Sequence, residues 1–118
     1  MRYYIIIERN KNNKYRFQLF YCGKKEMGYS KEYDSSENCI KGLDKFRQFI
    51  IDNEITDECD YLKVFECADN KYFIYQFVDD NNNVLYTSRK IENKTNCLKS
   101  MKSTCKNICN AEIKEIKE

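Results

Sequence analysis

Apolar positions follow a period of two over the first thirty residues of the chain. Residues 3–8 form a run of β-branched and aromatic side chains, and apolar residues alternate with other types over 15–22. Asn and Lys fill the interval 10–14, where such polar residues favour a turn. A further run ends near Ser30. This part of the sequence therefore predicts three β-strands.

A helical period follows the strands. Ser35 or Ser36 is a suitable N-cap, and Glu37 supplies an acidic residue in the first turn. The apolar residues beyond it recur at spacings that place them on one helix face: Cys39, Ile40, Leu43, Phe46 and Ile50. The segment 54–56 then favours a short fourth strand. The predicted unit is β-β-β-α-β.

The second half of the sequence repeats the first. Residues 79–83 predict a turn before a strand at 84–88, Asn93 predicts a helix cap, and 112–116 predicts the last strand. The apolar face of the second helix comprises Cys97, Leu98, Met101, Cys105 and Ile108. An ungapped shift of 58 residues aligns eleven identities: Tyr3 with Tyr61, Glu8 with Glu66, Asn12 with Asn70, Gln18 with Gln76, Ser30 with Ser88, Asn38 with Asn96, Cys39 with Cys97, Lys41 with Lys99, Ile50 with Ile108, Glu54 with Glu112 and Ile55 with Ile113. We therefore expect a single domain, residues 1–118, made of two repeats, 1–58 and 59–118.

The repeat also predicts the fold class. Three strands and one helix bury too little surface to be stable alone. Two such units joined edge to edge share one layer of strands and one layer of helices. We therefore predict an α+β fold in which two tandem β-β-β-α-β repeats form one antiparallel sheet with two helices packed on one face.

At these positions the chain resembles the small YegP-like family of tandem β3-α-β repeats. The motifs of the first unit are Phe17-Gln18-Leu19, Gly23, Ser30-Lys31-Glu32-Tyr33, Ser35 and Gly42-Leu43. Those of the second are Tyr75-Gln76-Phe77, Asn81-Asn82-Asn83, Ser88-Arg89-Lys90-Ile91 and Ser100-Met101. The resemblance implies one antiparallel sheet with helices on one face, and a C-terminal strand of each repeat that crosses to complete its neighbour. It implies no activity and no catalytic residue.

Composition excludes several classes of function. The chain has no His, so Ser/His/Asp triads, Cys/His dyads and His-containing zinc sites are ruled out. With 21 basic and 19 acidic residues, the net charge of +2 provides no strong attraction for nucleic acid or anionic membranes. The longest apolar run, residues 3–7, is too short to span a membrane, and no signal peptide is expected. We expect a protein that is not an enzyme.

The seven cysteines indicate a reducing compartment, and hence a cytoplasmic protein. An odd number of thiols without a signal peptide favours free cysteines that act as small apolar side chains. Cys105 and Cys109 lie four apart, on one helix face, but two thiolates alone make a poor zinc site. We expect buried free thiols, with no metal site and no cofactor.

The sheet face opposite the helices is the leading candidate for a binding surface. In the repeat alignment, apolar residues fall on both faces of the strands, and an exposed apolar face marks an interface. The residues expected on this second face are Tyr4, Ile6, Phe20, Leu62, Val64, Ile74 and Val78. They predict a protein–protein interface, with a partner protein or with a second copy in a homodimer. Two alternatives stay open, in which long Lys and Arg side chains cover these residues or the register slips by one residue.

Two other features favour different chemistry. Ser30 and Ser88 occupy matching sites, and without a nearby base each is expected to bond local backbone. Exposed lysines on the second helix, together with the many tyrosines, are the minimal set for a nucleotide or single-stranded nucleic-acid site. These lysines are Lys94, Lys99, Lys102 and Lys106.

Frequent Lys, Asn and Ile with no Pro, Trp or His are typical of an AT-rich coding sequence. Such sequences occur in phages, viruses and low-GC bacteria, and from such a source we expect a phage, viral or mobile-element accessory protein that blocks a host protein in the host cytoplasm.

Overall fold

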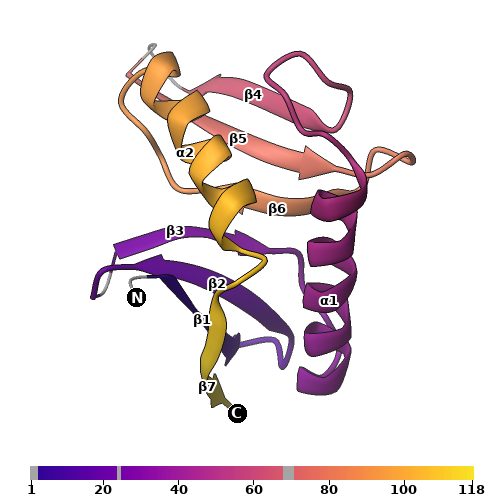
Figure 1. The fold of residues 1–118 in the computed structure, drawn as a ribbon. Helices are drawn as coiled ribbons and strands as arrows, with labels where there is room; N and C mark the ends of the chain where they lie inside the picture. The colour runs from indigo at the N-terminus through magenta and orange to yellow at the C-terminus, as the bar shows by residue number, and fades with distance from the viewer. Residues whose placement is uncertain (1–2, 24, 68–70) are drawn as a thin grey trace.

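In the part of the chain that the structure describes, seven strands and two helices follow one another in the order that the periodicity predicts, with one exception. The computed structural model describes residues 3–23, 25–67 and 71–118. The first repeat contains β1 (Tyr3–Arg9), β2 (Tyr15–Tyr21), β3 (Lys25–Ser30) and α1 (Ser36–Asp52). The second contains β4 (Leu62–Cys67), β5 (Tyr72–Val78), β6 (Val84–Ser88), α2 (Lys94–Asn107) and β7 (Glu112–Lys117). Figure 1 shows the strands in one sheet.

Asn and Asp side chains form two of the turns, the one between β1 and β2 and the one between β5 and β6. Asn10 Oδ1, before β2, accepts hydrogen bonds from the backbone N–H groups two and four residues later, at 2.9 and 3.0 Å. Asp79 Oδ1, before β6, does the same at 2.9 and 2.9 Å. Asn13 and Asn82, three residues after each of them, adopt a positive φ of 62° and 66°. These are the side-chain properties from which the turns were predicted.

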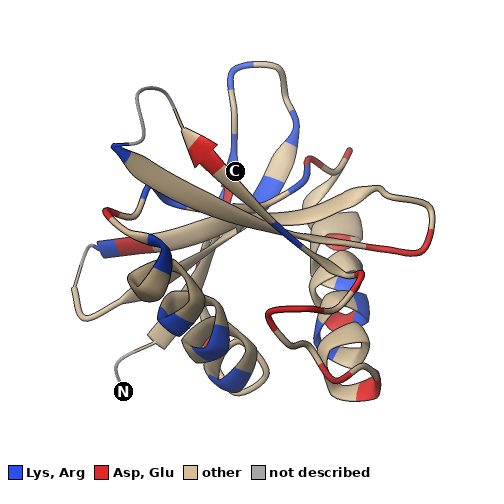
Figure 2. Cartoon of the chain, turned by 90° about the horizontal axis from the view of Figure 1, so that it is seen from above, with Lys and Arg blue, Asp and Glu red and all other residues tan. Residues whose placement is uncertain are grey.

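The helices begin at the predicted caps and cover one face of the sheet. Ser35 Oγ accepts a hydrogen bond from the backbone N–H of Asn38 at 3.0 Å. Asn93 caps α2 in the same way, through Asn96 at 2.8 Å. Both helices lie on the same side of the sheet (Figures 1 and 2). The predicted α+β class, with one sheet and helices on one face, is confirmed.

The two repeats meet at an antiparallel pair in the middle of the sheet. The strand order is β4-β5-β6-β3-β2-β1-β7, so that β3 pairs with β6. Tyr29 lies opposite Thr87, and these two residues are equivalent in the repeat alignment. A local two-fold axis between the repeats therefore passes through this pair.

The sheet is mixed, where a purely antiparallel one was expected. β7 crosses to the first repeat and pairs in parallel with β1, with Ile5 opposite Ile113. Residues 108–111 connect α2 to β7, and β7 continues in the direction of the helix (Figure 1). Because β1 runs in the same direction, β7 pairs with it in parallel.

No strand forms at residues 54–56, which corrects the prediction for the first repeat. The segment is irregular and leads into a turn in which the Cys59 N–H bonds the Thr56 carbonyl oxygen. Acidic residues that disfavour strands follow at Asp57, Glu58 and Asp60. Ile55 still packs against the core. Only the second repeat therefore sends a strand across to its neighbour.

The core is asymmetric around the local two-fold axis. The Phe46 ring on α1 stacks on the Tyr86 ring on β6, with centroids 5.6 Å apart and planes at 9°. A Cβ atom on Gly28 would lie 2.4 Å from Tyr86 Oη and 2.6 Å from the Thr87 carbonyl oxygen. Gly28 is the equivalent of Tyr86, and Thr104 is the equivalent of Phe46. At each of these two pairs of equivalent positions, one repeat has a large residue and the other a small one.

Two buried tyrosine hydroxyls differ in their hydrogen bonding. Tyr75 Oη lies 2.7 Å from Thr104 Oγ1. Burial raises the pKa of Tyr75 to about 12, so the phenol is neutral over the physiological range. Tyr86 Oη is buried and has no hydrogen-bond partner in the described part of the chain. The burial of the Tyr75 hydroxyl is therefore better compensated than that of the Tyr86 hydroxyl.

Removing each hydroxyl tests this difference. Tyr75→Phe should lower the free energy of unfolding by about 1–3 kcal/mol, because it leaves the buried Thr104 hydroxyl without its partner. Tyr86→Phe should leave the free energy of unfolding unchanged or raise it by about 1 kcal/mol, because it removes an unpaired buried hydroxyl. Urea denaturation followed by circular dichroism measures both. Equal losses in the two variants would contradict this description of the core.

Candidate functional site

Two of the predicted interface residues, Leu62 and Val64, face the helices. β4 pairs with β5 so that Leu62 lies opposite Phe77, as Ile5 lies opposite Leu19 in the first repeat. Leu62 is therefore the structural equivalent of Ile5, which lies 57 residues earlier. The sequence alignment, with its shift of 58 residues, had matched Leu62 with Tyr4 instead. Leu62 is buried, and Val64 packs against the core. Their assignment to the second face was wrong, because side chains change faces when the register shifts by one residue.

The sheet face away from the helices, here called the open face, has a polar centre. Because paired residues share a face, the register defines one row of side chains across it: Ile6, Gln18, Tyr29, Thr87, Gln76 and Lys63. Gln18 Nε2 donates a hydrogen bond of 2.7 Å to Glu26. Gln76 Nε2 lies 3.2 Å from Thr87 Oγ1. A polar stripe therefore crosses the junction between the repeats, with side-chain hydrogen bonds inside each repeat.

A first apolar patch lies on one side of this stripe, in the first repeat. Tyr4 and Phe20 stack with ring centroids 5.5 Å apart and planes at 8°. Ile6 lies two residues along the same strand, and all three side chains are half-buried. Lys114 Nζ, from β7, is 4.5 Å from the centroid of the Tyr4 ring. This patch is partly covered by a cation from the same chain.

A second apolar patch lies in the second repeat, on the same side of this stripe and separated from the first by the two central strands β3 and β6. Phe65 is opposite Ile74 in the β4–β5 pair, and its side chain is 45% exposed. Val78 lies on the opposite side of the stripe, beyond Gln76 on β5; it is buried, lies outside the helix-facing core and is not part of this patch. Phe65 was missed in the sequence because the alignment placed it on the helix side. The polar Lys63 between Leu62 and Val64 is the signal that indicates the correct face.

The structure contains both features that were expected to reduce the apolar surface, the shift in register and the cover by Lys and Arg side chains, each for some of the residues. The register shift removes two residues from the open face. Cations cover some of its rings, since Arg16 Cζ is 4.3 Å from the Tyr29 centroid and Lys90 Nζ is 4.7 Å from that of Tyr72. Tyr4, Ile6, Phe20 and Ile74 lie on the open face as predicted, whereas Val78 is buried and offers no contact surface, which corrects that assignment. The apolar surface is thus divided into two patches.

The lysines of α2 lie away from the open face. Lys94, Lys99, Lys102 and Lys106 are all exposed, and α2 contains no acidic residue. The helix packs on the opposite side of the sheet (Figure 2). The lysines therefore do not combine with the tyrosines of the open face into one surface.

Ser30 and Ser88 have the structural role that was expected. Ser30 Oγ accepts a hydrogen bond from the Phe17 N–H at 3.0 Å and donates one to the Lys31 carbonyl oxygen at 2.7 Å. Ser88 makes the same two bonds, with Tyr75 and Arg89, at 2.9 and 2.8 Å. Each hydroxyl is buried and satisfies a backbone N–H group of the neighbouring strand.

The seven cysteines are free and differ in exposure. Cys39 and Cys97 are buried, Cys22 is exposed, and the other four are half-buried. Burial raises the pKa of Cys39 to about 12 and also raises that of Cys97. Within residues 3–23, 25–67 and 71–118, no three His, Cys, Asp or Glu side chains are grouped to hold a metal ion. Neither described helix combines the length and apolar character needed to cross a membrane.

Two solved structures share this fold. One is the solution NMR structure of a UPF0339 protein from Shewanella oneidensis, with 16% identity, a TM-score of 0.75, and coverage of 98% of this chain and 92% of that one. The other is the solution NMR structure of yegP from E. coli, a protein of unknown function, with 17% identity, a TM-score of 0.76, and coverage of 98% and 93%. The resemblance to the YegP-like family is thereby confirmed at the level of the fold. Neither the protein-family models nor the curated proteins gave a match.

The exposure of the thiols predicts their order of reaction. Cys22 should react first with an aromatic disulfide reagent at pH 8, and Cys22→Ser should remove this fast phase. Cys39 and Cys97 should react only in denaturant, because a buried thiol of raised pKa supplies little accessible thiolate. Mass spectrometry of labelled peptides identifies each site. Labelling of Cys39 in the native protein at the rate of Cys22 would contradict the packing of α1.

Proposed function

We propose that this chain is a non-catalytic protein-binding module and that the open face is its contact surface. Its partner is a second copy of the chain or another protein, and the proposed role as a phage, viral or mobile-element protein that blocks a host protein fits the second case. The observation that carries the proposal is the exposed Phe65 ring beside Ile74, on a sheet whose other face is already filled by the helices.

The composition of the open face supports this proposal. Aromatic residues and Arg are enriched at the centres of protein interfaces, and Phe65, Tyr4, Phe20 and Arg16 all belong to this face. The sheet holds these side chains in fixed positions, so little side-chain entropy is lost on binding. The polar stripe beside the patches supplies groups that can form hydrogen bonds with a partner.

Self-association is the first test, with a matched control on α1. Ile51 is 65% exposed on α1, away from the open face, so Ile51→Lys changes exposed apolar surface elsewhere. If two copies associate through the open face, Phe65→Lys should raise the dimer dissociation constant by at least about tenfold, as for the loss of an interface anchor. Ile51→Lys should leave it unchanged. Sedimentation equilibrium over a concentration series measures both variants.

If the chain is monomeric at all concentrations, the next test is the binding of another protein. Wild-type chain and both variants are then used as bait in the source cells. A partner retained by Ile51→Lys and lost by Phe65→Lys supports the open face, whereas a partner that all three baits capture equally removes this face as the site.

The alternative function, nucleotide or single-stranded nucleic-acid binding, is favoured by the exposed lysines of α2. Its signature is an affinity that falls steeply with salt and is reduced in Lys102→Gln/Lys106→Gln. Binding through the open face depends only weakly on salt. The two functions are therefore distinguishable in one titration.

A further inference from the structure

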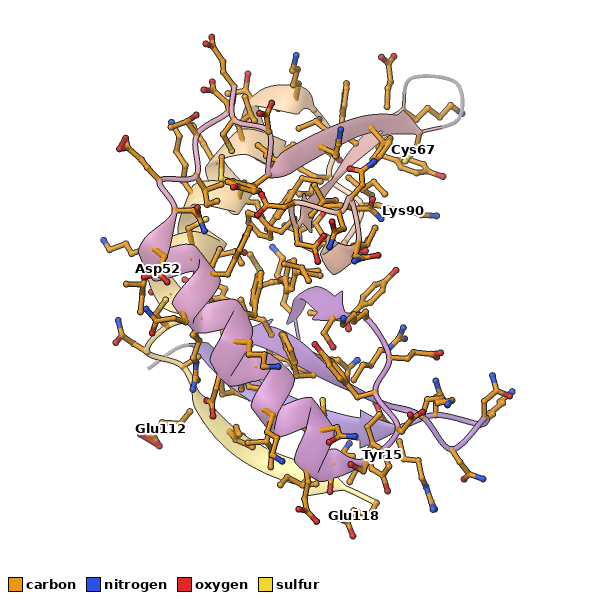
Figure 3. All side chains as sticks on the ribbon, turned by 90° about the vertical axis from the view of Figure 1, so that its right-hand side faces the viewer. Tyr15, Asp52, Cys67, Lys90, Glu112 and Glu118 are labelled. Carbon is orange, nitrogen blue, oxygen red and sulfur yellow. The ribbon has the colours of Figure 1, made fainter. Side chains whose placement is uncertain are left out.

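A cavity of about 600 Å³ lies beside α1, on the helix side of the sheet. Its apolar walls come from Tyr33 after β3, Phe46 and Phe49 on α1, and Leu85 on β6. Figure 3 views the molecule from the side on which α1 lies, with Asp52 at the end of that helix. The volume falls in the range of small-molecule sites, about 300–1,000 Å³. The cavity belongs to neither patch of the open face.

The equivalent place in the second repeat holds a smaller cavity, and the described part of its lining contains no aromatic residue. There the cavity of about 420 Å³ is lined by residues 89–92 and by Asn96, the equivalent of Asn38. Beside it, the Tyr3 and Tyr21 rings lie 4.7 Å apart, and Tyr3 Oη is 2.6 Å from Ser103 Oγ. The equivalents of Tyr21 and Ser103 in the large cavity are Asp79 and Lys45. The short Asp79 stands where the equivalent place in the second repeat has the Tyr21 ring, which leaves more room in the first repeat.

Two lysines on the rim of the cavity are available for a ligand. Lys41 and Lys45 lie one turn apart on α1, both exposed, and neither forms an ion pair among the described residues. Lys31, the third lysine of the rim, lies 5.5 Å from the centroid of the Tyr33 ring.

The acidic residues of the rim already have partners. Asp34 is paired with Lys14, and Glu32 accepts a hydrogen bond from Asn10. Asp79 Oδ1 accepts two backbone hydrogen bonds within its own turn. Only Asp34 is neutralised by a cation, so three lysines face the two remaining carboxylates, Glu32 and Asp79, and the rim carries a net charge of +1.

We infer that this cavity binds a small aromatic acid. The ring of the ligand packs against Phe46, Phe49 and Leu85, because aromatic rings combine large apolar burial with favourable ring contacts. The acidic group points to the rim and meets Lys41 and Lys45. An uncharged ligand of the same shape lacks the interaction with Lys41 and Lys45. We therefore expect the site to bind an acid more tightly than the corresponding amide.

A titration with two probes of equal shape tests this inference. Indole-3-acetate and indole-3-acetamide are added to ¹⁵N-labelled protein, and amide shifts are followed by NMR. The acid should shift residues of the cavity, among them Tyr33, Phe46 and Leu85, and bind about fivefold or more tightly than the amide, as one exposed charge interaction predicts. Lys41→Gln/Lys45→Gln should abolish this preference.

Lys99→Gln is the matched control, because Lys99 is the equivalent of Lys41 on α2. It should bind the acid as the wild type does. No shift in the cavity up to about 5 mM acid, a range that covers weak binding of ligands this small, would overturn the inference. Equal affinity for acid and amide, or shifts confined to α2 or to the open face, would overturn it as well.

Discussion

The stack of Phe46 on Tyr86 over Gly28 is the contact on which the shared core depends. It joins α1 of the first repeat to β6 of the second, directly above the β3–β6 pair. A symmetric pair of large residues cannot fit there, because a single Cβ on Gly28 would already collide with Tyr86. The chain solves this with one large and one small residue at each pair of equivalent positions, Tyr86 with Gly28 and Phe46 with Thr104.

This asymmetry extends from the core to the surface. On α2 the small Thr104 leaves room for the Tyr75 hydroxyl, and the smaller cavity lies beside this helix. On α1 the larger cavity lies beside Phe46 and Phe49. The open face likewise carries a cation over Tyr4 in one repeat and an exposed Phe65 in the other. Duplication provides the fold, and the differences between the copies provide the surfaces available for binding.

The sequence predicted those features that depend on interactions between residues close together in the chain or on adjacent strands. The helix caps Ser35 and Asn93, the turn at Asp79 and the buried serines depend on side chains within a few residues, or on one neighbouring strand, and these predictions are confirmed. The errors arose where a long-range register decides. A one-residue difference in the first strand of the second repeat moved Leu62 and Val64 to the core and Phe65 to the surface. The parallel β7–β1 pair and the irregular 54–56 segment also depend on where the chain travels after each helix, which periodicity does not encode.

Denaturation of a Gly28→Ala variant tests the shared core most directly. Alanine in place of glycine within a strand ordinarily stabilises a protein slightly, by about 0.5–1 kcal/mol. Here the account predicts that the free energy of unfolding falls by about 1–3 kcal/mol, because the added methyl group overpacks the site against Tyr86 and the Thr87 backbone. A free energy of unfolding that is unchanged or raised would contradict it.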